Sequence, residues 1–594
     1  MTLSDVQATF CATLLDEWCR AGVVHAVVCP GSRSTPMALA IAAEPRLSMH
    51  VVLDERSAAF FAVGLGRATG KPAVLLCTSG TAAVEFHPAV VEAHLDRVPM
   101  LVVTADRPPD LHGIGAPQTV DQSHLYGRST RAFFEPGVAD NATAPAWRSL
   151  AARAVIAAVG GVDAPGPVHL NLAFREPLVG KARRLPVGRP KGQTWHRMLP
   201  DGNADTGMSV SLSRELLDTV NRRLSRRRGI VVAGAGSGDP VAVRNLALAL
   251  NWPLLADPRS GARGGGPGGP GDAGPVTVAH ADAILRSAGL AQDLRPEVVL
   301  RLGAPWSSKV LNLWLATVPN DVLVDPYRAW LDPNRASSLT LAIDPSVLCR
   351  LLAHEVEPVE SGWARAWARV DAAARLVVAR QLDDPDGPVS EPAIVRAFSR
   401  SVPTGSQVVV SSSMPVRDLE WFGADRSDVV VFANRGANGI DGVVSTALGV
   451  AAAATGPTFA LIGDLAFLHD AGALVLAAQH RSNCTFLVID NAGGGIFEFL
   501  PQATSVERSK FEALYGTPQI VDPARLAQAH GLRVSRPRSL RALTMQLRKS
   551  AVTDGVSVIV MRTDRRENVT VHDQLNQAVL TAAESAAHRR SEAV

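Results

Sequence analysis

The sequence predicts an α/β protein made of three doubly wound parallel-sheet domains, and three observations support this fold class. Continuous apolar runs recur along the chain and alternate with helical patterns, which is typical of parallel strands covered by helices on both faces. The chain has 594 residues, which is too long for one ordinary hydrophobic core. A polar stretch containing Pro and Gly at 186–210 reads as a linker, so we expect the first domain at 1–185.

The first domain is expected to alternate helices and strands in a regular order. The expected helices cover 4–21, 36–43, 57–69 and 82–94. The expected strands run through 25–30, 49–55, 72–80, 99–107 and 166–174. Because these strand segments contain continuous apolar runs, we expect them to form a sheet that is buried on both faces.

Two further domains are expected after the linker. A middle domain is expected at 211–355, a linker or helix at 356–389 and a last domain at 390–594. The expected strands of the middle domain run through 229–236, 252–257, 297–303 and 321–326. The expected strands of the last domain run through 406–413, 429–436, 458–464, 484–491 and 556–562. A Gly/Pro-rich insert at 261–274 lengthens the middle domain, and the low complexity of 259–274 predicts a mobile loop.

Composition and charge exclude several classes of partner. The net charge of +3 is near neutral for this size, and the one dense arginine cluster, at 222–228, is more typical of a solvated face than of a nucleic-acid surface. The six cysteines include no CxxC pair, and the N-terminus lacks signal-peptide features, which together favour a cytoplasmic protein. The longest apolar stretch, 443–462, is broken by a Thr-Gly-Pro turn, so we expect no membrane span.

Polar residues follow two of the expected strands in the last domain. Gly463 and Asp464 come directly after the run TFALI, where backbone N–H groups and a helix N-terminus can hold a phosphate. Asn491 follows the run TFLVID, 27 residues after Asp464, and a glycine-rich segment comes next. Their oxygens suit a Mg²⁺ ion that bridges two phosphates, with the carbonyl group of Gly493 as a third ligand. A Gly-Asp pair after a strand is often only a turn, but the whole arrangement resembles the signature of thiamine-diphosphate enzymes.

An enzyme of that kind also needs a carboxylic acid hydrogen-bonded to N1′ of the aminopyrimidine ring, which promotes removal of the C2 proton. Glu55 fits, because it ends the run HVVLDE in a different domain and precedes an apolar helix. Phe60 and Phe61 of that helix are expected to exclude water and raise the pKa of the carboxyl group. Acidic residues are common at helix starts for local reasons as well, so the assignment depends on the signature in the last domain.

Short motifs in all three expected domains carry a more specific resemblance. They are GSRSTP from Gly31, DERSAAF from Asp54, CTSGT from Cys77, TADRPPDL from Thr104, GPVHLNLAFREPL from Gly166, SEP from Ser390, SSMPVRD from Ser412 and NRGANGIDG from Asn434. In order and local spacing they resemble the MenD family, the 2-succinyl-5-enolpyruvyl-6-hydroxy-3-cyclohexene-1-carboxylate synthases of menaquinone biosynthesis. The resemblance implies a pyrimidine-binding, a middle and a diphosphate-binding domain of the thiamine-diphosphate enzyme type.

The resemblance also implies an activity and an assembly. Enzymes of this family are transferases of the transketolase or carboligase type that decarboxylate 2-oxoglutarate and add the resulting succinic-semialdehyde carbanion equivalent to isochorismate in a 1,4 addition. Their cofactors are thiamine diphosphate and Mg²⁺, for which Mn²⁺ can substitute. The family design implies a homodimer or homotetramer with active sites at the subunit interface, so that Glu55 and Asp464 of one site belong to different subunits.

Several arginines stand at the expected carboxyl ends of strands, where ligands bind in open α/β sheets. The two substrates carry four carboxylates between them, so their site needs several guanidinium groups, although any single exposed arginine is more often a surface residue. By resemblance, the substrate-binding residues are Ser32, Arg33, Arg107, Gln118, Lys309, Ser413, Arg417 and Arg435, with Lys309 aligned only loosely. The cofactor-binding residues are Glu55, Ser413, Met414, Ile440, Gly463, Asp464, Leu465, Asn491, Gly493, Ile496 and Phe497, of which Asp464, Asn491 and Gly493 hold the metal.

By the same resemblance, Ile440 is an apolar wedge that bends the cofactor, while Ile496 and Phe497 line its thiazolium ring; ordinary core packing is the other reading of all three. Pro117 stands where the family often has Asn, which puts one substrate contact in doubt.

Two alternatives stay open. Another thiamine-diphosphate 2-oxoacid decarboxylase or carboligase would share the cofactor motifs, although the middle domain lacks the dinucleotide fingerprint of a flavin-containing one. A binding protein on a retired enzyme scaffold would be expected to have lost Glu55, Asp464 or Asn491, and all three are present.

Overall fold

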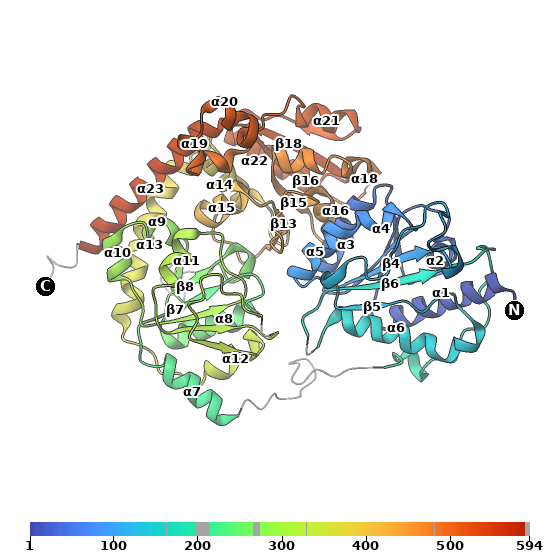
Figure 1. Cartoon of the computed structure of the whole chain (residues 1–594). Coiled ribbons are helices and arrows are strands. Elements are labelled where there is room, and N and C mark those ends of the chain that lie inside the picture. The colour runs from blue at the N-terminus through green and yellow to red at the C-terminus, as the bar shows by residue number, and fades with distance from the viewer. Residues whose placement is uncertain (162, 197–212, 265–273, 328, 480, 589–594) are drawn as a thin grey trace.

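The computed structural model describes residues 1–161, 163–196, 213–264, 274–327, 329–479 and 481–588, which form three α/β domains (Figure 1). Each domain has one six-stranded sheet, and the described strand pairs are parallel, so the predicted fold class is confirmed. In Figure 1 the third domain, coloured orange to red, lies across the blue first domain and the green middle domain. Within the described ranges, no helix combines the length and the apolar character needed to cross a membrane.

The first sheet has the strand order β2-β1-β3-β4-β6-β5. Its strands are β1 (His25–Val28), β2 (Ser48–Val51), β3 (Ala73–Cys77), β4 (Met100–Asp106), β5 (Ala132–Phe134) and β6 (Pro167–Ala173). Its helices are α1 (Leu3–Arg20), α2 (Thr35–Ala43), α3 (Glu55–Thr69), α4 (Thr81–Glu85), α5 (His87–Leu95) and α6 (Ala144–Val159). The strands β3 and β4 are buried along their whole length, as expected for a sheet covered on both faces.

The middle sheet has the order β12-β11-β10-β7-β8-β9. Its strands are β7 (Gly229–Ala233), β8 (Leu254–Ala256), β9 (Thr277–Val278), β10 (Val298–Leu302), β11 (Asp321–Val324) and β12 (Leu339–Leu341). The helices around and after it are α7 (Arg214–Leu224), α8 (Pro240–Leu250), α9 (Ala281–Ile284), α10 (Ala288–Asp293), α11 (Lys309–Leu315), α12 (Pro345–Leu352) and α13 (Ser361–Leu382).

The third sheet has the order β14-β13-β15-β16-β18-β17, which repeats the order of the first sheet. Its strands are β13 (Gln407–Val410), β14 (Val430–Phe432), β15 (Thr458–Gly463), β16 (Cys484–Asp490), β17 (Arg533–Ser535) and β18 (Val556–Arg562). Its helices are α14 (Glu391–Ser401), α15 (Met414–Phe422), α16 (Val443–Ala453), α17 (Asp464–His469), α18 (Ala473–Gln479), α19 (Gln502–Ser505), α20 (Arg508–Phe511), α21 (Pro523–Ala529), α22 (Leu540–Ala551) and α23 (Arg565–His588).

The structure differs from the sequence-based expectation in its shortest elements. The strands β5, β9, β12 and β17 were not predicted; each has only two or three residues and lies at the edge of its sheet. Segments of that length are too short to show a hydrophobic period. The single helix expected at 82–94 is two helices, α4 and α5, because Pro88 lacks an N–H group and instead occupies the first turn of α5.

The expectation of a mobile loop at 259–274 is wrong for its first residues. Arg263 is fully buried, and its guanidinium donates to the carbonyl oxygens of Glu420 (2.7 Å) and Gly423 (3.2 Å) at the end of α15. An arginine that satisfies several carbonyl groups fixes the backbone that carries it. Residues 265–273 of this loop lie outside the described residues, as do residues 197–210 of the predicted linker.

Close packing of two helices joins the first and third domains. A Cβ atom at Gly64 of α3 would collide with the carbonyl oxygen of Thr446 on α16, and one at Gly449 of α16 would collide with that of Phe61 on α3. The missing side chains let the two backbones touch, and both domains share one hydrophobic core. The core of the middle domain is likewise continuous with the third domain through α13 and α23. The domain arrangement around the candidate sites is therefore fixed by packing.

Candidate active site

The first and third sheets each open a cavity at the same place in their common strand order. In the first sheet β1 lies beside β3, and in the third β13 lies beside β15, although another strand separates each pair in sequence. Residues following β1 and β3 line a cavity of about 660 Å³. Residues following β13 and β15 line a second cavity of about 570 Å³. The carboxyl ends of strands at such a change of chain direction are where open parallel sheets bind ligands.

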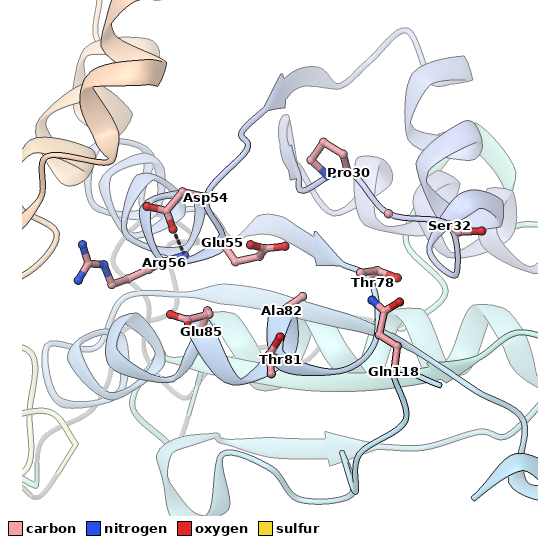
Figure 2. Close-up of a pocket in the computed structure, with 11 residues that line it drawn as sticks. Pro30, Ser32, Asp54, Glu55, Arg56, Thr78, Thr81, Ala82, Glu85 and Gln118 are labelled. Carbon is pink, nitrogen blue, oxygen red and sulfur yellow. Dashed lines mark hydrogen bonds between the residues drawn. The ribbon is translucent and has the colours of Figure 1, made fainter. Parts of the chain in front are cut away.

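The cavity of the first domain contains the predicted residues Ser32, Glu55 and Gln118 (Figure 2). Glu55 is the first residue of α3, and Figure 2 shows its carboxylate turned into the cavity toward Thr78 at the end of β3. Asp54 caps the helix by accepting the backbone N–H of Arg56 at 3.0 Å, so the Glu55 backbone is held at a defined place.

The electrostatic surroundings of Glu55 favour its protonated form. Glu55 is half-buried, and burial is the main cause that raises the pKa of its carboxyl group. The neighbouring carboxylates of Asp54 and Glu85 raise this pKa further. The direction is the one expected from the sequence, and it suits a carboxylic acid that shares a proton with a ring nitrogen.

The two predicted arginines of the first domain lie beside this cavity rather than on its wall. Arg33 is buried. Its guanidinium donates to the backbone carbonyl of Phe174 at 2.9 Å and to the carboxylate of Glu176 at 3.3 Å. Arg107 donates to the hydroxyl group of Ser79. Gln118 donates to the backbone carbonyl of Ser79 at 2.9 Å, so both Arg107 and Gln118 are anchored to the segment after β3.

The cavity of the third domain brings together most of the predicted cofactor residues and two predicted arginines. They are Ser413, Met414, Arg417, Arg435, Ile440, Gly463, Asp464, Leu465, Asn491, Gly493, Ile496 and Phe497. Arg417 donates to the Ser413 carbonyl at 2.6 Å, which ties its guanidinium to the start of α15. Burial and the adjacent cations Arg259 and Arg417 lower the pKa of Arg435 to about 10. The wall is therefore rich in positive charge and suits an anionic ligand.

The predicted metal ligands meet at the ends of β15 and β16. Asp464, only 5% exposed, accepts the backbone N–H groups of Leu465 and Gly493 at 2.8 Å. Asn491 donates its amide N–H to Glu391 at 2.8 Å, while its Oδ1 is buried without a hydrogen-bond partner. A buried acceptor in that state fits a cation. Burial raises the pKa of Asp464 to about 7, and a bound divalent cation would reverse that shift.

The donor set matches a metal held jointly with a diphosphate. In the part of the chain that the structure describes, no three or more His, Cys, Asp or Glu side chains are grouped to hold a metal on their own. Asp464, Asn491 and a glycine carbonyl offer only three oxygens, so a Mg²⁺ ion, which takes six, would need the remainder from phosphate and water. Ile440 leaves 39% of its surface exposed on the same wall, which is where an apolar side chain can contact a bound ring.

Sequence reasoning and the structure differ at a few site residues. Lys309 is an exposed residue at the start of α11 and lies on the wall of neither cavity. Glu391 was not predicted, yet it is buried beside Asn491 on the cavity wall; the SEP motif was the only sequence signal for it. Asn438 also lines the cavity, in a left-handed backbone conformation with φ of 63°. It lies within the NRGANGIDG motif but was not singled out as a site residue.

The corresponding crevice of the middle domain is occupied by its own backbone. β7 lies beside β10 in that sheet, and the N–H group of Ala304 after β10 donates to the carbonyl of Ala235 after β7 at 2.8 Å. A Cβ atom at Gly234 would collide with the carbonyl oxygen of Ala304. The two loops thus meet where a dinucleotide would lie in a nucleotide-binding domain of this strand order.

Comparison with known proteins finds three successive family models along the chain. Family models match residues 10–125 (thiamine pyrophosphate enzyme, N-terminal TPP binding domain), 210–410 (middle domain of thiamine pyrophosphate) and 428–561 (thiamine pyrophosphate enzyme, C-terminal TPP binding domain). A 2-succinyl-5-enolpyruvyl-6-hydroxy-3-cyclohexene-1-carboxylate synthase of Geobacillus kaustophilus (strain HTA426) is 41% identical over 96% of this chain and 97% of its own length. Relatives with the same name from Chloroflexus aurantiacus (strain ATCC 29366 / DSM 635 / J-10-fl) and Myxococcus xanthus (strain DK1622) are 40% and 39% identical, over 95% and 96% of this chain and 96% and 97% of their own lengths.

Proposed function

The chain belongs to the family of 2-succinyl-5-enolpyruvyl-6-hydroxy-3-cyclohexene-1-carboxylate synthases, and from this premise we propose that it makes this product and CO₂ from 2-oxoglutarate and isochorismate. The reaction is a decarboxylation followed by a 1,4 addition, and it is a step of menaquinone biosynthesis. We propose thiamine diphosphate and Mg²⁺ as cofactors, with Mn²⁺ as a substitute metal. All six cysteines are free thiols, which suits the cytoplasmic location that we propose with this function.

The observation that carries the proposal is the pair of cavities at matching positions in the first and third sheets. Glu55 lines one cavity, Asp464 and Asn491 line the other, and the two walls have no residue in common. Together with the family design, in which the site lies between subunits, these separate walls support a cofactor that contacts Glu55 of one chain and Asp464 of the other. A homodimer is the smallest active unit in this proposal, and a homotetramer would contain two such dimers.

Each end of the cofactor has a fitting group of side chains. Asp464, Asn491 and the carbonyl of Gly493 would hold Mg²⁺ on the diphosphate. Ile440 would contact the rings of the cofactor. Glu55 of the partner chain would keep a proton at N1′ of the aminopyrimidine, because burial raises its pKa. The bound cofactor supplies the carbanion chemistry for decarboxylation and carbon–carbon bond formation.

The substrates are rich in carboxylates, and both cavities offer cations and polar groups for them. Arg417 and Arg435 stand on the wall beside the cofactor residues of the third domain. Ser32 and Gln118 would complete the site from the first domain, with Arg33 and Arg107 behind them. Burial makes each guanidinium a stronger partner for a carboxylate, because little water screens the pair. A 2-oxoacid decarboxylase with a neutral acceptor would have little use for this charge.

An activity assay tests the reaction directly. The purified enzyme with thiamine diphosphate, Mg²⁺, 2-oxoglutarate and isochorismate should form the named product. No product together with rapid turnover of pyruvate would favour the alternative decarboxylase or carboligase. Glu55→Gln should lower kcat by about 10²–10⁴-fold while Mg²⁺-dependent cofactor binding stays near the wild-type value. Unchanged turnover in that variant would remove Glu55 from the mechanism.

A complementation experiment tests the shared site. Glu55→Gln and Asp464→Asn should each be nearly inactive alone. When the two variants are co-expressed and assemble at random, half of the dimers contain one chain of each kind. Each mixed dimer has one intact site out of two, so about one quarter of wild-type activity should return. A site formed within one chain would give no recovery in the mixture.

A further inference from the structure

The loop that carries Arg435 and Ile440 is held by the first domain of the same chain. This loop, 434–442, connects β14 to α16. Glu92 on α5 reaches it from the first domain, and only 2% of the Glu92 surface is exposed. Glu92 lies on the wall of neither cavity, and no step described above uses it.

The Glu92 carboxylate accepts two successive backbone N–H groups of the loop. Its Oε1 accepts the N–H of Gly436 at 3.0 Å, and its Oε2 accepts the N–H of Ala437 at 2.7 Å. These residues directly follow Arg435 in the sequence. Hydrogen bonds to an ionised acceptor are stronger than neutral ones, and two of them fix both the position and the orientation of the backbone.

Arg67 holds the Glu92 carboxylate in this position. Its Nη2 donates to Glu92 Oε1 at 2.8 Å, and its other amino group pairs with Asp96. The side chains of Arg67 and Glu92 are 9% and 3% exposed, so the ion pair is buried. A buried carboxylate that has a cation on one side and two amides on the other has every oxygen satisfied and no freedom to turn.

The backbone contact at the same point is too close for any side chain. A Cβ atom at Gly436 would lie 2.7 Å from the carbonyl oxygen of Glu92 and 3.0 Å from the amide nitrogen of Asp96. On the other side of Arg435, the Asn434 carbonyl accepts the hydroxyl of Ser412 at 3.3 Å. The backbone is therefore anchored immediately before and immediately after Arg435.

Arg435 itself is left available for a ligand. Across the described ranges, no hydrogen bond or ion pair joins its guanidinium to another residue, and it lines the cavity of the third domain. A long side chain without partners depends on its backbone for its direction. We propose that Glu92 is a positioning residue for substrate recognition, which fixes the backbone after Arg435 so that the guanidinium stays directed at a substrate carboxylate. This proposal rests on the proposed function, because it requires Arg435 to bind that carboxylate.

Glu92→Gln is the direct test, because glutamine keeps the shape but offers one acceptor where the loop needs two. We expect KM for one of the two carboxylate substrates to rise about tenfold, the effect of losing one hydrogen bond to a charged group, with kcat within about twofold. The affinity for thiamine diphosphate with Mg²⁺, followed by tryptophan fluorescence, should not change. Asp96→Asn is the matched control: it removes a partner of the same Arg67 but no bond to the loop, and should leave KM unchanged.

A double-mutant cycle shows whether Glu92 acts through Arg435. Arg435→Ala should raise the same KM, and adding Glu92→Gln should raise it no further, since the group being positioned is already gone. Additive effects would overturn the proposal, as would a wild-type KM in Glu92→Gln while Arg435→Ala is impaired. If Arg435→Ala leaves both KM values unchanged, the role of Arg435 in the proposed function fails and this proposal fails with it.

Gly436→Ala approaches the same contact from the loop side and serves if Glu92→Gln does not fold. Its Cβ atom would push the loop away from the end of α5, so it should raise the same KM and spare cofactor affinity. A folded Gly436→Ala enzyme with wild-type KM would overturn the proposal.

Discussion

His572 and Asp418 form a buried ion pair between the C-terminal helix α23 and the helix α15. His572 Nε2 lies 2.6 Å from Asp418 Oδ1, and its Nδ1 lies 2.8 Å from the carbonyl oxygen of Asn568. Both ring nitrogens face acceptors, so both must carry hydrogen and the ring is an imidazolium. Burial alone would lower the pKa of His572, but the charge and hydrogen bond of Asp418 outweigh it and raise the pKa above its usual value.

Asp418→Asn should remove this pair and the pH dependence that comes with it. A histidine whose pKa is raised on folding stabilises the protein fully below its unfolded pKa, about 6.5, and the contribution is lost as pH rises through the folded pKa. A charge left without its partner would cost about 3–5 kcal/mol. His572 can instead release its proton and accept the new amide, so we expect about 1.5–3 kcal/mol, the value of a hydrogen bond to a charged group.

The measurement is the thermal midpoint of variant and wild type at pH 6 and pH 9. The variant should be destabilised at pH 6, and the gap should shrink as pH rises through the folded pKa of His572, because the wild-type pair then loses its proton. Asp428→Asn is the control, because it removes an acid from the more exposed pair with Arg426 and should cost less than about 1 kcal/mol. A gap for Asp418→Asn that is equal at both pH values would refute the imidazolium assignment.

Three further predictions concern packing, the metal and the domain contact. Gly449→Ala would push a Cβ atom into the Phe61 carbonyl and should cost about 1–3 kcal/mol, seen as a lower thermal midpoint; an unchanged midpoint would show that α3 and α16 can separate freely. Glu391→Gln disturbs the acceptor that orients Asn491 and should weaken Mg²⁺ binding about tenfold in a fluorescence titration, whereas wild-type affinity would argue against Asn491 as a ligand. Arg263→Ala removes hydrogen bonds to the carbonyl groups of Glu420 and Gly423 in the third domain and of Ala279 in the middle domain, together with the ion pair to Asp425. It should cost about 3–5 kcal/mol by denaturant unfolding, and a loss below about 1 kcal/mol would contradict its role between the domains.

The part of the site that could be predicted from the sequence lies at strand ends. Asp464 and Asn491 each follow a long apolar run, and parallel strands bring such ends to one edge of a sheet whatever the rest of the chain does. Glu55 has the same kind of local signal at the start of α3. Local pattern and the rules of parallel sheets were therefore enough to bring Asp464 and Asn491 into one cavity and Glu55 into another.

The supporting residues could not be predicted, because their roles arise from contacts between distant segments. Glu391 meets Asn491 across 100 residues of sequence, and Glu92 meets Gly436 across 344. A buried glutamate in a helix carries no local mark of its partner. Arg33 shows the opposite difficulty, a residue that the sequence places in the site and the structure does not. It was predicted to bind substrate, but its guanidinium donates to the carbonyl of Phe174 and lies beside the cavity.

Helix α3 carries both a proposed catalytic residue and a residue that supports the Arg435 loop. Helix α3 begins at Glu55, which the proposed function places in the active site shared with the partner chain. In its last turn Arg67 holds Glu92, and through Glu92 the Arg435 loop of its own chain. Glu55 and Arg67 are separated by about 18 Å along the helix axis. In the proposed dimer, each first domain would supply a group to one active site and support the other, so the packing of α3 on α16 would set the geometry of both.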